Sequence, residues 1–486
     1  MTKAAAIIGG GVIGGGWAAR FLLNGWDVNI SDPDPEAGRK IGEVLANARR
    51  SLPGLADTAM PEEGCLTFCN SIAEAVEGAD WIQESVPERL ELKHDIYAEI
   101  QKTAISDAVI GSSTSGFKPS FLQAGSANPA QIMVCHPFNP VYLLPLVEIV
   151  PHDATSTLIL QKAISLLQGI GMKPLHVKKE IDAHIANRLL EAVWRESLWL
   201  IKDDIASTQE IDDAIRFGFG LRWAQMGLFE TYRVAGGEAG MEHFIAQFGP
   251  ALAWPWTKLT DVPELTDELV RTIARQSDEQ SGMYSIRELE QIRDNNLVAI
   301  MRGLKSQNWG VGTFLKEHDM VMAASQAREI DFSKPIRALT RAVPPDWTDY
   351  NGHMNEARYL QAFSEATDRF MEIIGCDADY VANGNSYFTA ETHIRHIEEV
   401  YAGTHIYVEI QCISGEGKKM HVFNTLRHED GRLLATGEQM LIHTNLKTRC
   451  SSLPELQVAE KLKMIAAYHA ELPQPEGIGH VGTPRS

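Results

Sequence analysis

Apolar and polar positions along the first third of the chain switch repeatedly between strand and helix spacing. Apolar runs that predict strands begin at residue 3 and recur at 27–31, 67–69, 80–83, 109–111 and 132–134. Between them, amphipathic stretches predict helices at 35–52, 71–78 and 88–103. Strands that alternate with helices form βαβ units. The pattern therefore predicts an α/β domain with a mostly parallel, doubly wound sheet to about residue 180.

Two other patterns follow this domain. Residues 183–325 lack strand alternation, and their spacing predicts helices at 183–203, 208–217, 235–248, 264–277 and 285–306. The helical spacing stops near residues 326–335. Beyond it, the pattern predicts a strand at 336–343, one long helix ending near Ile374, and strands at 386–397, 404–414, 418–428 and 432–445. One helix followed by antiparallel strands indicates an α+β domain in which a curled sheet wraps the helix.

Composition narrows the class of protein. A chain of 486 residues suggests about three domains, and 44% hydrophobic with 22% charged residues is typical of soluble globular proteins. The formal net charge of -20 disfavours binding to nucleic acid or to an anionic membrane. Six cysteines are scattered without CxxC pairs. We therefore expect a cytoplasmic location, no disulfide framework and no metal site.

A glycine-rich turn is the first motif that indicates chemistry. The run KAAAIIGGGVIGGG places Gly9, Gly11 and Gly14 in the order GxGxxG between a predicted strand and a predicted helix. These glycines allow a tight turn, a close approach of backbone to pyrophosphate, and close helix packing. Asp32 ends the next strand, where an acid accepts hydrogen bonds from the adenosine ribose and repels a 2′-phosphate. The turn predicts NAD as the cofactor, although Asp32 before Pro33 also suits a helix N-cap.

Five motifs in order resemble the 3-hydroxyacyl-CoA dehydrogenase superfamily over residues 1–320: GGGVIG, ESVPERLELK, SSTSGF, HPFNPVYLLPLVEIV and HIANRLL. The resemblance implies a Rossmann-type domain, followed by a helical domain that supplies the dimer interface and the outer wall of the substrate site. It also implies roles for particular residues: His136 as general base, Glu148 as its hydrogen-bond partner, Ser115 and Asn187 at the reacting oxygen, and Glu84 and Lys93 in cofactor binding.

The residue types agree with that chemistry. Oxidation of a secondary alcohol needs a group that removes the hydroxyl proton, and imidazole titrates near neutral pH. Structural alternatives exist as well, because His136 could cap a strand end and Ser115 could be an ordinary turn residue. Asn187 lies on an apolar helix, where asparagine is a poor helix former, so a functional role is favoured.

The helical region is rich in aromatic residues. The run GFGLRWAQMGLFETYRVAGGEAGMEHF is similar to the superfamily branch of carnitine dehydrogenase, gulonate dehydrogenase and lambda-crystallin, which implies a small hydroxy acid as substrate. Aromatic rings attract a quaternary ammonium group by cation–π contact, but helix core and dimer contacts are an alternative use. Arg188 or Arg222 could pair with a substrate carboxylate or form surface salt bridges. The tryptophans concentrated there are Trp194, Trp199, Trp223, Trp254 and Trp256.

A second family motif lies in the last domain. The run DYNGHMNEARY resembles the hot-dog acyl-CoA thioesterase family of the 4-hydroxybenzoyl-CoA type, over about residues 334–446. The resemblance implies Asp349 as nucleophile or general base, and the helix that follows Gly352 offers an N-terminus to polarise a thioester carbonyl. Secondary candidates are Asn351, His353 and Glu365. Alternatively, Asp349 forms an Asx turn, or the domain only mediates oligomerisation.

These expectations combine into a domain plan and a hypothesis. The expected parts are a Rossmann NAD-binding domain (1–182), a helical substrate and dimerisation domain (183–328), a hot-dog domain (329–450) and a tail (451–486). Residues 447–486 are expected to form a helix followed by a loose end. We hypothesise a homodimeric enzyme that oxidises L-carnitine to 3-dehydrocarnitine with NAD and hydrolyses betainyl-CoA to betaine and CoA. One alternative is a 3-hydroxyacyl-CoA dehydrogenase with a general acyl-CoA thioesterase. Another is an NAD-binding structural protein of the lambda-crystallin kind, against which the presence of His136 and Glu148 weighs.

Overall fold

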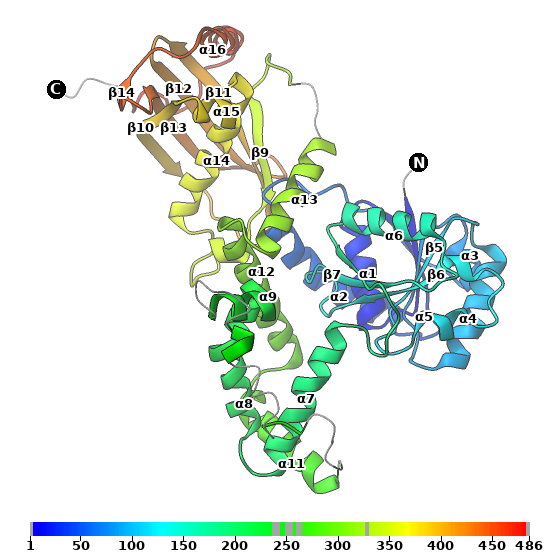
Figure 1. The fold of residues 1–486 in the computed structure, drawn as a ribbon. Coiled ribbons are helices and arrows are strands. Elements are labelled where there is room, and N and C mark those ends of the chain that lie inside the picture. Colours follow the sequence, from blue (N-terminus) through cyan, green and yellow to red (C-terminus); the bar gives the residue numbers. More distant parts are fainter. Residues whose placement is uncertain are drawn as a thin grey trace. The chain divides into compact units, whose positions relative to one another are not determined.

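The computed structural model describes residues 3–235, 244–247, 256–258, 264, 266–325 and 330–482. The chain forms two compact units (Figure 1). The first comprises residues 1–48 and 61–318, and the second comprises residues 49–60 and 319–486. The expected boundary between residues 328 and 329 and most of the expected helix 235–248 lie outside the described residues. Among the described helices, none is long and apolar enough to span a membrane.

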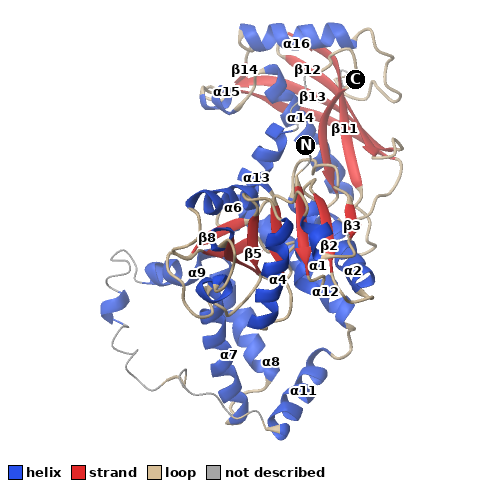
Figure 2. Ribbon diagram, turned by 90° about the vertical axis from the view of Figure 1, so that its right-hand side faces the viewer, coloured by secondary structure: helices blue, strands red, loops and turns tan. Residues whose placement is uncertain are grey.

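An eight-stranded sheet forms the centre of the first unit (Figure 2). Its strands are β1 (Ala4–Ile8), β2 (Asp27–Ser31), β3 (Leu66–Phe68), β4 (Trp81–Glu84), β5 (Val109–Ser112), β6 (Ile132–Pro137), β7 (Leu146–Val150) and β8 (Lys173–His176). They lie in the order β3-β2-β1-β4-β5-β6-β7-β8, and only β6 and β7 are antiparallel neighbours. The predicted doubly wound sheet is confirmed. Its strand order reverses between β1 and β4, the position where open α/β sheets bind ligands.

Helices cover both faces of this sheet: α1 (Val12–Leu22), α2 (Ala37–Ser51), α3 (Ile72–Val76), α4 (Leu90–Thr103), α5 (Pro119–Gln123) and α6 (Thr157–Gly169). On one face, Trp17 of α1 packs on Trp81 of β4, with ring centroids 6.0 Å apart. On the other face, Tyr97 of α4 joins the buried cluster that includes Ile82, the next residue of β4. Adjacent strand residues point to opposite faces, so β4 is buried on both sides.

Helices also make up the rest of the first unit: α7 (Ala186–Lys202), α8 (Thr208–Ala214), α9 (Gly220–Ala235), α11 (Asp267–Ser281), α12 (Ile286–Ser306) and the start of α13 (Val311–Ser325). Ser207 and Ser285 each form a capping box with the glutamate three residues later, which sets where α8 and α12 begin. The sequence pattern does not predict α9, because glycines interrupt its spacing. One of them, Gly227, has a φ of 71° inside the helix.

The second unit wraps an antiparallel sheet around one long helix, as predicted. Its strands lie in the order β10-β13-β12-β11-β9, with β14 paired to β13. Their bounds are β9 (Ile336–Ala342), β10 (Asn385–His396), β11 (His405–Glu416), β12 (Lys419–His428), β13 (Leu433–Asn445) and β14 (Cys450–Ser451). A short helix, α15 (Ala378–Ala382), precedes β10. The four long strands agree with the predicted ranges to within two residues.

Helix α14 (Glu356–Ile374) is the centre of this unit. The Asn355 side chain accepts a hydrogen bond from the Ala357 N–H at its start, and Gly375 ends it with a φ of 97°. The helix lies close to the sheet, since a Cβ atom added to Gly437 of β13 would come within 2.5 Å of the Phe363 ring. A larger residue at position 437 would therefore push the helix away from the sheet.

Residues 49–60 belong to the second unit, although the expected Rossmann domain (1–182) includes them. Their helical turn Leu52–Leu55 is buried, and Gly54 packs on Pro344 and Pro345. The Asp57 carboxylate lies 2.9 Å from Nη2 of the buried Arg341. This segment leaves the Rossmann sheet between α2 and β3 to pack elsewhere, which the local hydrophobic pattern gives no means to foresee.

The expected tail (451–486) includes the helix that the pattern predicts there, and this helix packs on the core of the second unit. The helix is α16 (Leu456–His469), whose Val458, Leu462 and Ile465 are part of that core. His469 is buried; its Nδ1 accepts a hydrogen bond from Cys412 N–H at 2.8 Å, and its Nε2 donates to the Lys334 carbonyl at 3.0 Å. The hot-dog core therefore extends past residue 450.

We predict that acid destabilises the second unit through His469. Burial lowers the pKa of His469, although the bond to Lys334 opposes this. The unfolded chain therefore binds the proton more readily below about pH 6.5, and the free energy of unfolding falls as pH falls from there. His469→Gln should cost about 1–3 kcal/mol at pH 7.5 and flatten this dependence. Denaturant unfolding between pH 5 and 8 measures it, with His405→Gln, at a half-buried histidine near the surface, as control. An unchanged slope would contradict the prediction.

Candidate active sites

The glycine turn lies where β1 meets α1. Gly9 has a φ of 97°, and a Cβ atom there would lie 2.7 Å from the Ser85 carbonyl oxygen. A Cβ atom on Gly14 would lie 1.8 Å from the Gly9 carbonyl oxygen, so only glycine fits both positions. Gly11 has no atom within 4 Å of its Cβ position and is the N-cap of α1. The turn thus leaves open space in front of a helix N-terminus, which suits a pyrophosphate.

Asp32 joins this turn from the end of β2. One of its carboxylate oxygens accepts a hydrogen bond from Gly10 N–H, and the other accepts from Asp34 N–H at 2.7 Å. The acid is thus held beside the glycines while also shaping the turn before α2. The residues present fit an NAD molecule whose pyrophosphate lies at α1 and whose ribose lies at Asp32.

Glu84 and Lys93 form a buried ion pair at the end of β4, with 2.7 Å between Lys93 Nζ and Glu84 Oε1. Tyr97 and Ser112 hydroxyls donate to the other oxygen of Glu84 at 2.7 and 2.6 Å. Both charged groups are nearly inaccessible to solvent. The structure therefore places them beneath the loop at residues 85–88, and their predicted role in cofactor binding would act through that loop.

His136 and Glu148 are opposite each other on the antiparallel strands β6 and β7. This register explains their spacing of 12 residues, because the chain turns back between the two strands. His136 Nδ1 lies 2.9 Å from Glu148 Oε2. The His136 ring also makes an edge contact with Phe138, with 4.8 Å between ring centroids. With Nδ1 bonded to the carboxylate, Nε2 is the nitrogen left to exchange a proton with substrate.

The second oxygen of Glu148 connects the sheet to helix α7. Its Oε1 accepts hydrogen bonds from the Ile185 and Ala186 N–H groups, each at 2.9 Å. Burial by itself would raise the pKa of Glu148, but the bonds from His136 and these two N–H groups outweigh burial and lower the pKa. The carboxylate is therefore ionised when the imidazole needs a negative partner.

Ser115 and Asn187, the two residues expected at the reacting oxygen, lie close together. Asn187 Nδ2 donates to the Ser115 carbonyl at 3.1 Å. Ser115 is exposed after β5, and Asn187 is in the first turn of α7, two residues beyond Ile185. Three segments therefore meet at this point: the loop after β5, the pair on β6 and β7, and the start of α7.

The predicted aromatic residues give a weaker picture. The Trp199 ring already carries the ammonium groups of Lys202 and Lys258, each 4.4 Å from its centroid. Trp194, Trp223 and Trp256 are exposed, and Trp254 lies outside the described residues. Arg188 and Arg222 are also exposed. Which aromatic ring contacts a quaternary ammonium group therefore stays a prediction.

In the second unit, Asp349 lies in the loop before α14. Its Oδ1 accepts a hydrogen bond from Asn351 N–H at 2.8 Å, and its own N–H donates to the His353 carbonyl at 2.9 Å. Asp349 therefore forms the Asx turn that the sequence offers as an alternative. This bond uses one carboxylate oxygen, so a turn role and a chemical role for the second oxygen are compatible.

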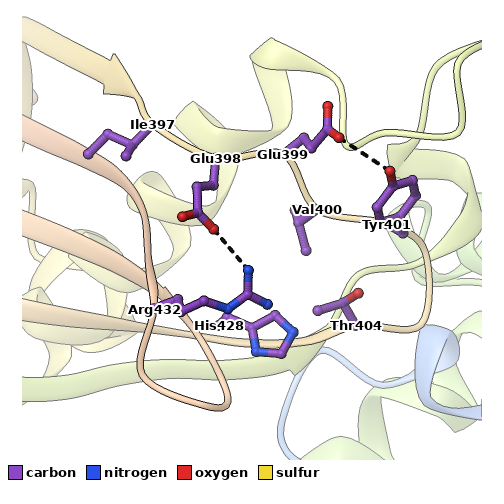
Figure 3. Close-up of a pocket in the computed structure, with 8 residues that line it drawn as sticks. All are labelled: Ile397, Glu398, Glu399, Val400, Tyr401, Thr404, His428 and Arg432. Carbon is purple, nitrogen blue, oxygen red and sulfur yellow. Dashed lines mark hydrogen bonds and ion pairs between the residues drawn. The ribbon is translucent and has the colours of Figure 1, made fainter.

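A pocket of about 500 Å³ lies beside this loop (Figure 3). The loop reaches the pocket wall through a hydrogen bond from Met354 N–H to the Val400 carbonyl at 2.8 Å. His353 Nδ1 lies 3.2 Å from Glu399 Oε2, and the Tyr401 hydroxyl donates to the other oxygen of Glu399 at 3.2 Å. Glu398 pairs with Arg432 across the pocket. His353 is therefore near this pocket with a carboxylate partner.

Glu365 is separate from that pocket. Its Oε2 lies 2.8 Å from Nη1 of Arg341, and its Oε1 accepts from Gln361 at 2.9 Å. Arg341 stacks over the Trp347 ring at 4.3 Å. Both oxygens of Glu365 are thus engaged, one with Gln361 on the same helix and one with Arg341, which makes Glu365 a weaker candidate than Asp349 for attack on a thioester.

Three families match successive parts of the chain. The 3-hydroxyacyl-CoA dehydrogenase NAD binding domain matches residues 4–181, the 3-hydroxyacyl-CoA dehydrogenase C-terminal domain matches residues 184–284, and the thioesterase-like superfamily matches residues 343–468. A Ruegeria pomeroyi protein named L-carnitine dehydrogenase/betainyl-CoA thioesterase is 64% identical over 484 residues, which are 99% of each chain. The chain belongs to this family of fused dehydrogenase and thioesterase proteins.

Two further proteins match the dehydrogenase side of this family. A Mesorhizobium japonicum protein named L-carnitine dehydrogenase is 59% identical over 334 residues, 68% of this chain and 92% of that one. A solved structure, an NAD+-dependent 5-formyl-3-hydroxy-2-methylpyridine 4-carboxylic acid 5-dehydrogenase, is 27% identical, with a TM-score of 0.53 over 63% of this chain and 99% of that one. Family membership confirms the Rossmann, helical and hot-dog folds and NAD as the cofactor. The roles of individual residues stay predictions.

The structure also brings residues into the site that the sequence patterns do not single out. Tyr97 and Ser112 complete the surroundings of Glu84. His184 lies against His136, with 5.5 Å between ring centroids. The available signal for His184 was its place in the HIANRLL motif, three residues before Asn187.

We predict that Glu148→Gln lowers the kcat of NAD-dependent oxidation at least about 10²-fold. The amide keeps the shape but loses the negative charge that stabilises the protonated imidazole, and it favours the wrong tautomer of His136. NAD binding, followed by tryptophan fluorescence, should be unchanged. Glu180→Gln, an equal change on the same domain, serves as control. A kcat close to that of the wild type would show that Glu148 does not assist His136.

Proposed function

We propose that the chain oxidises L-carnitine to 3-dehydrocarnitine with NAD and hydrolyses betainyl-CoA to betaine and CoA. The relative that bears both names aligns with this chain along 99% of its length. The observation that carries the dehydrogenase assignment is the buried His136–Glu148 pair, at the same sheet edge as the glycine turn. The non-catalytic alternative of the lambda-crystallin kind gives no reason for such a pair.

Proton removal begins at Nε2 of His136. The Glu148 carboxylate holds the Nδ1 proton, so the imidazole accepts the proton of the substrate hydroxyl at Nε2 and becomes positively charged beside an anion. Ser115 and Asn187 orient the oxygen that turns from hydroxyl to carbonyl. NAD, when bound, supplies the acceptor for the hydride that leaves the carbon bearing this oxygen. His136 then gives this proton to solvent, which restores the neutral base.

Thioester hydrolysis in the second unit needs a base or nucleophile and a group that stabilises the oxyanion. We assign the first task to Asp349, whose second carboxylate oxygen is outside the Asx turn. Helix α14 begins seven residues later, at Glu356, and its N-terminal N–H groups supply the positive end of the helix dipole. His353, with its Glu399 partner, remains the second candidate for proton transfer to the leaving thiolate.

We further propose that the enzyme is a cytoplasmic homodimer. Helix α7 exposes Leu189, Leu190 and Trp194, each more than half accessible, which a second copy could cover. The six cysteines are free, as expected for a reducing compartment.

A substrate panel tests the dehydrogenase. NAD reduction, read by absorbance, should occur with L-carnitine and be much slower with 3-hydroxybutyryl-CoA. His136→Gln should lower kcat at least about 10²-fold, whereas His176→Gln, an exposed histidine on β8, should not. Reduction with 3-hydroxybutyryl-CoA alone would instead support the acyl-CoA alternative.

Asp349→Asn tests the thioesterase. Because the amide still accepts the hydrogen bond from Asn351 but is a poor base and nucleophile, betainyl-CoA hydrolysis should fall about 10²-fold or more. Oxidation of L-carnitine by the same preparation should not change. Asp346→Asn, an exposed carboxylate three residues earlier, is the matched control. Unchanged thiol release by Asp349→Asn would remove Asp349 from the mechanism.

A further inference from the structure

A second histidine in the dehydrogenase unit is buried without a role in the chemistry above. His184 has 0% of its surface exposed. Its ring is tilted by 48° against the ring of His136, with 5.5 Å between centroids. Burying a polar ring costs free energy unless its nitrogens form hydrogen bonds. The hydrogen bonds of His184 therefore decide what this buried ring contributes.

The hydrogen bonds of His184 indicate a neutral ring. Its Nε2 lies 3.3 Å from the Thr114 carbonyl oxygen, which can only accept, so Nε2 carries the proton. Its Nδ1 is buried and has no hydrogen-bond partner among the described residues. Burial lowers the pKa of His184, and the neighbouring His136 lowers it further. His184 therefore acts as a hydrogen-bond donor to the backbone.

The backbone at His184 is unusual as well. Ala183 and His184 have φ angles of 59° and 53°, two successive non-glycine residues in the left-handed region. Such conformations are strained for residues other than glycine and persist only where surrounding contacts hold them. The two residues after this turn, Ile185 and Ala186, donate both of their N–H groups to Glu148.

We propose that His184 is a positioning residue of the dehydrogenase. Its bond to Thr114 holds the left-handed turn in place, and the turn holds the two N–H groups that orient Glu148 and, through it, His136. Asn187 is fastened in the same way to Ser115, the residue after Thr114. The loop after β5 and the start of α7 are thus joined at two points, and His184 is the inner one. The inference rests on the proposed dehydrogenase function of this site.

Three variants separate the hydrogen bond from simple volume. His184→Leu fills the space without a donor, and His184→Phe keeps a flat ring without a donor. His184→Gln restores an N–H group at a similar reach. Leu and Phe should lower kcat for L-carnitine about 10- to 100-fold, because a small misplacement of a catalytic group has that effect. Gln should recover most of the loss. His94→Leu, which removes a histidine bond from α4 to the Phe121 carbonyl on α5, is the matched control.

Further measurements on the full-length protein with NAD distinguish a positioning role from a loss of folding. Betainyl-CoA hydrolysis and NAD binding should be unchanged, which shows that both units remain folded. Amide hydrogen exchange in residues 183–190 should be faster in the Leu and Phe variants and slow in the Gln variant. This exchange measurement needs no substrate. It tests the inference even if wild-type protein does not oxidise L-carnitine, which would overturn the proposed function alone.

Two results would contradict the positioning role of His184. Wild-type kcat and exchange in His184→Leu would overturn the positioning role. So would a His184→Gln variant as slow and as rapidly exchanging as His184→Leu, because the bond to Thr114 would then not be what holds the turn.

Discussion

The buried carboxylate of Glu148 is the interaction on which the dehydrogenase unit depends. An ionised carboxylate without solvent needs partners for both oxygens, and Glu148 has three such partners. These three partners come from two places: one oxygen receives His136 from β6, and the other receives the adjacent Ile185 and Ala186 N–H groups at the start of α7. The antiparallel pairing of β6 with β7 and the entry of α7 are therefore linked, since a shift of either would leave a buried charge without a partner.

The second unit also contains a histidine–carboxylate pair, but this pair is more exposed to solvent. Its histidine–carboxylate pair, His353 and Glu399, is 31% and 61% exposed, whereas the side chains of His136 and Glu148 are 7% and 0% exposed. Solvent screens an exposed pair, so it contributes little to orientation. The loop is held instead by backbone bonds and by Arg341, which stacks on Trp347 and pairs with Glu365. The two units thus carry separate sites with separate cores on one chain.

Much of the fold follows from local pattern. The strands β2 and β4, the helices α4 and α12 and all four long strands of the second unit lie within two residues of their predicted ranges. The patterns do not predict β7 and β8. β7 lies in PVYLLPLVEIV, where prolines break the alternation. It pairs antiparallel with β6, whereas the other neighbouring strands of this sheet are parallel. The patterns predict a helix where α16 lies but not its place in the core of the second unit, because an amphipathic helix does not reveal which core it covers.

The sequence by itself determined the order of folds, the glycine turn and the residue types of each site, because these depend on spacing and on motifs that lie close together along the chain. Tertiary structure decided the rest. It placed His136 opposite Glu148, turned residues 183–186 toward the same carboxylate, and moved residues 49–60 into the second unit. Each of these depends on contacts between distant residues, and a pattern of neighbours carries no record of which distant groups will satisfy a buried charge.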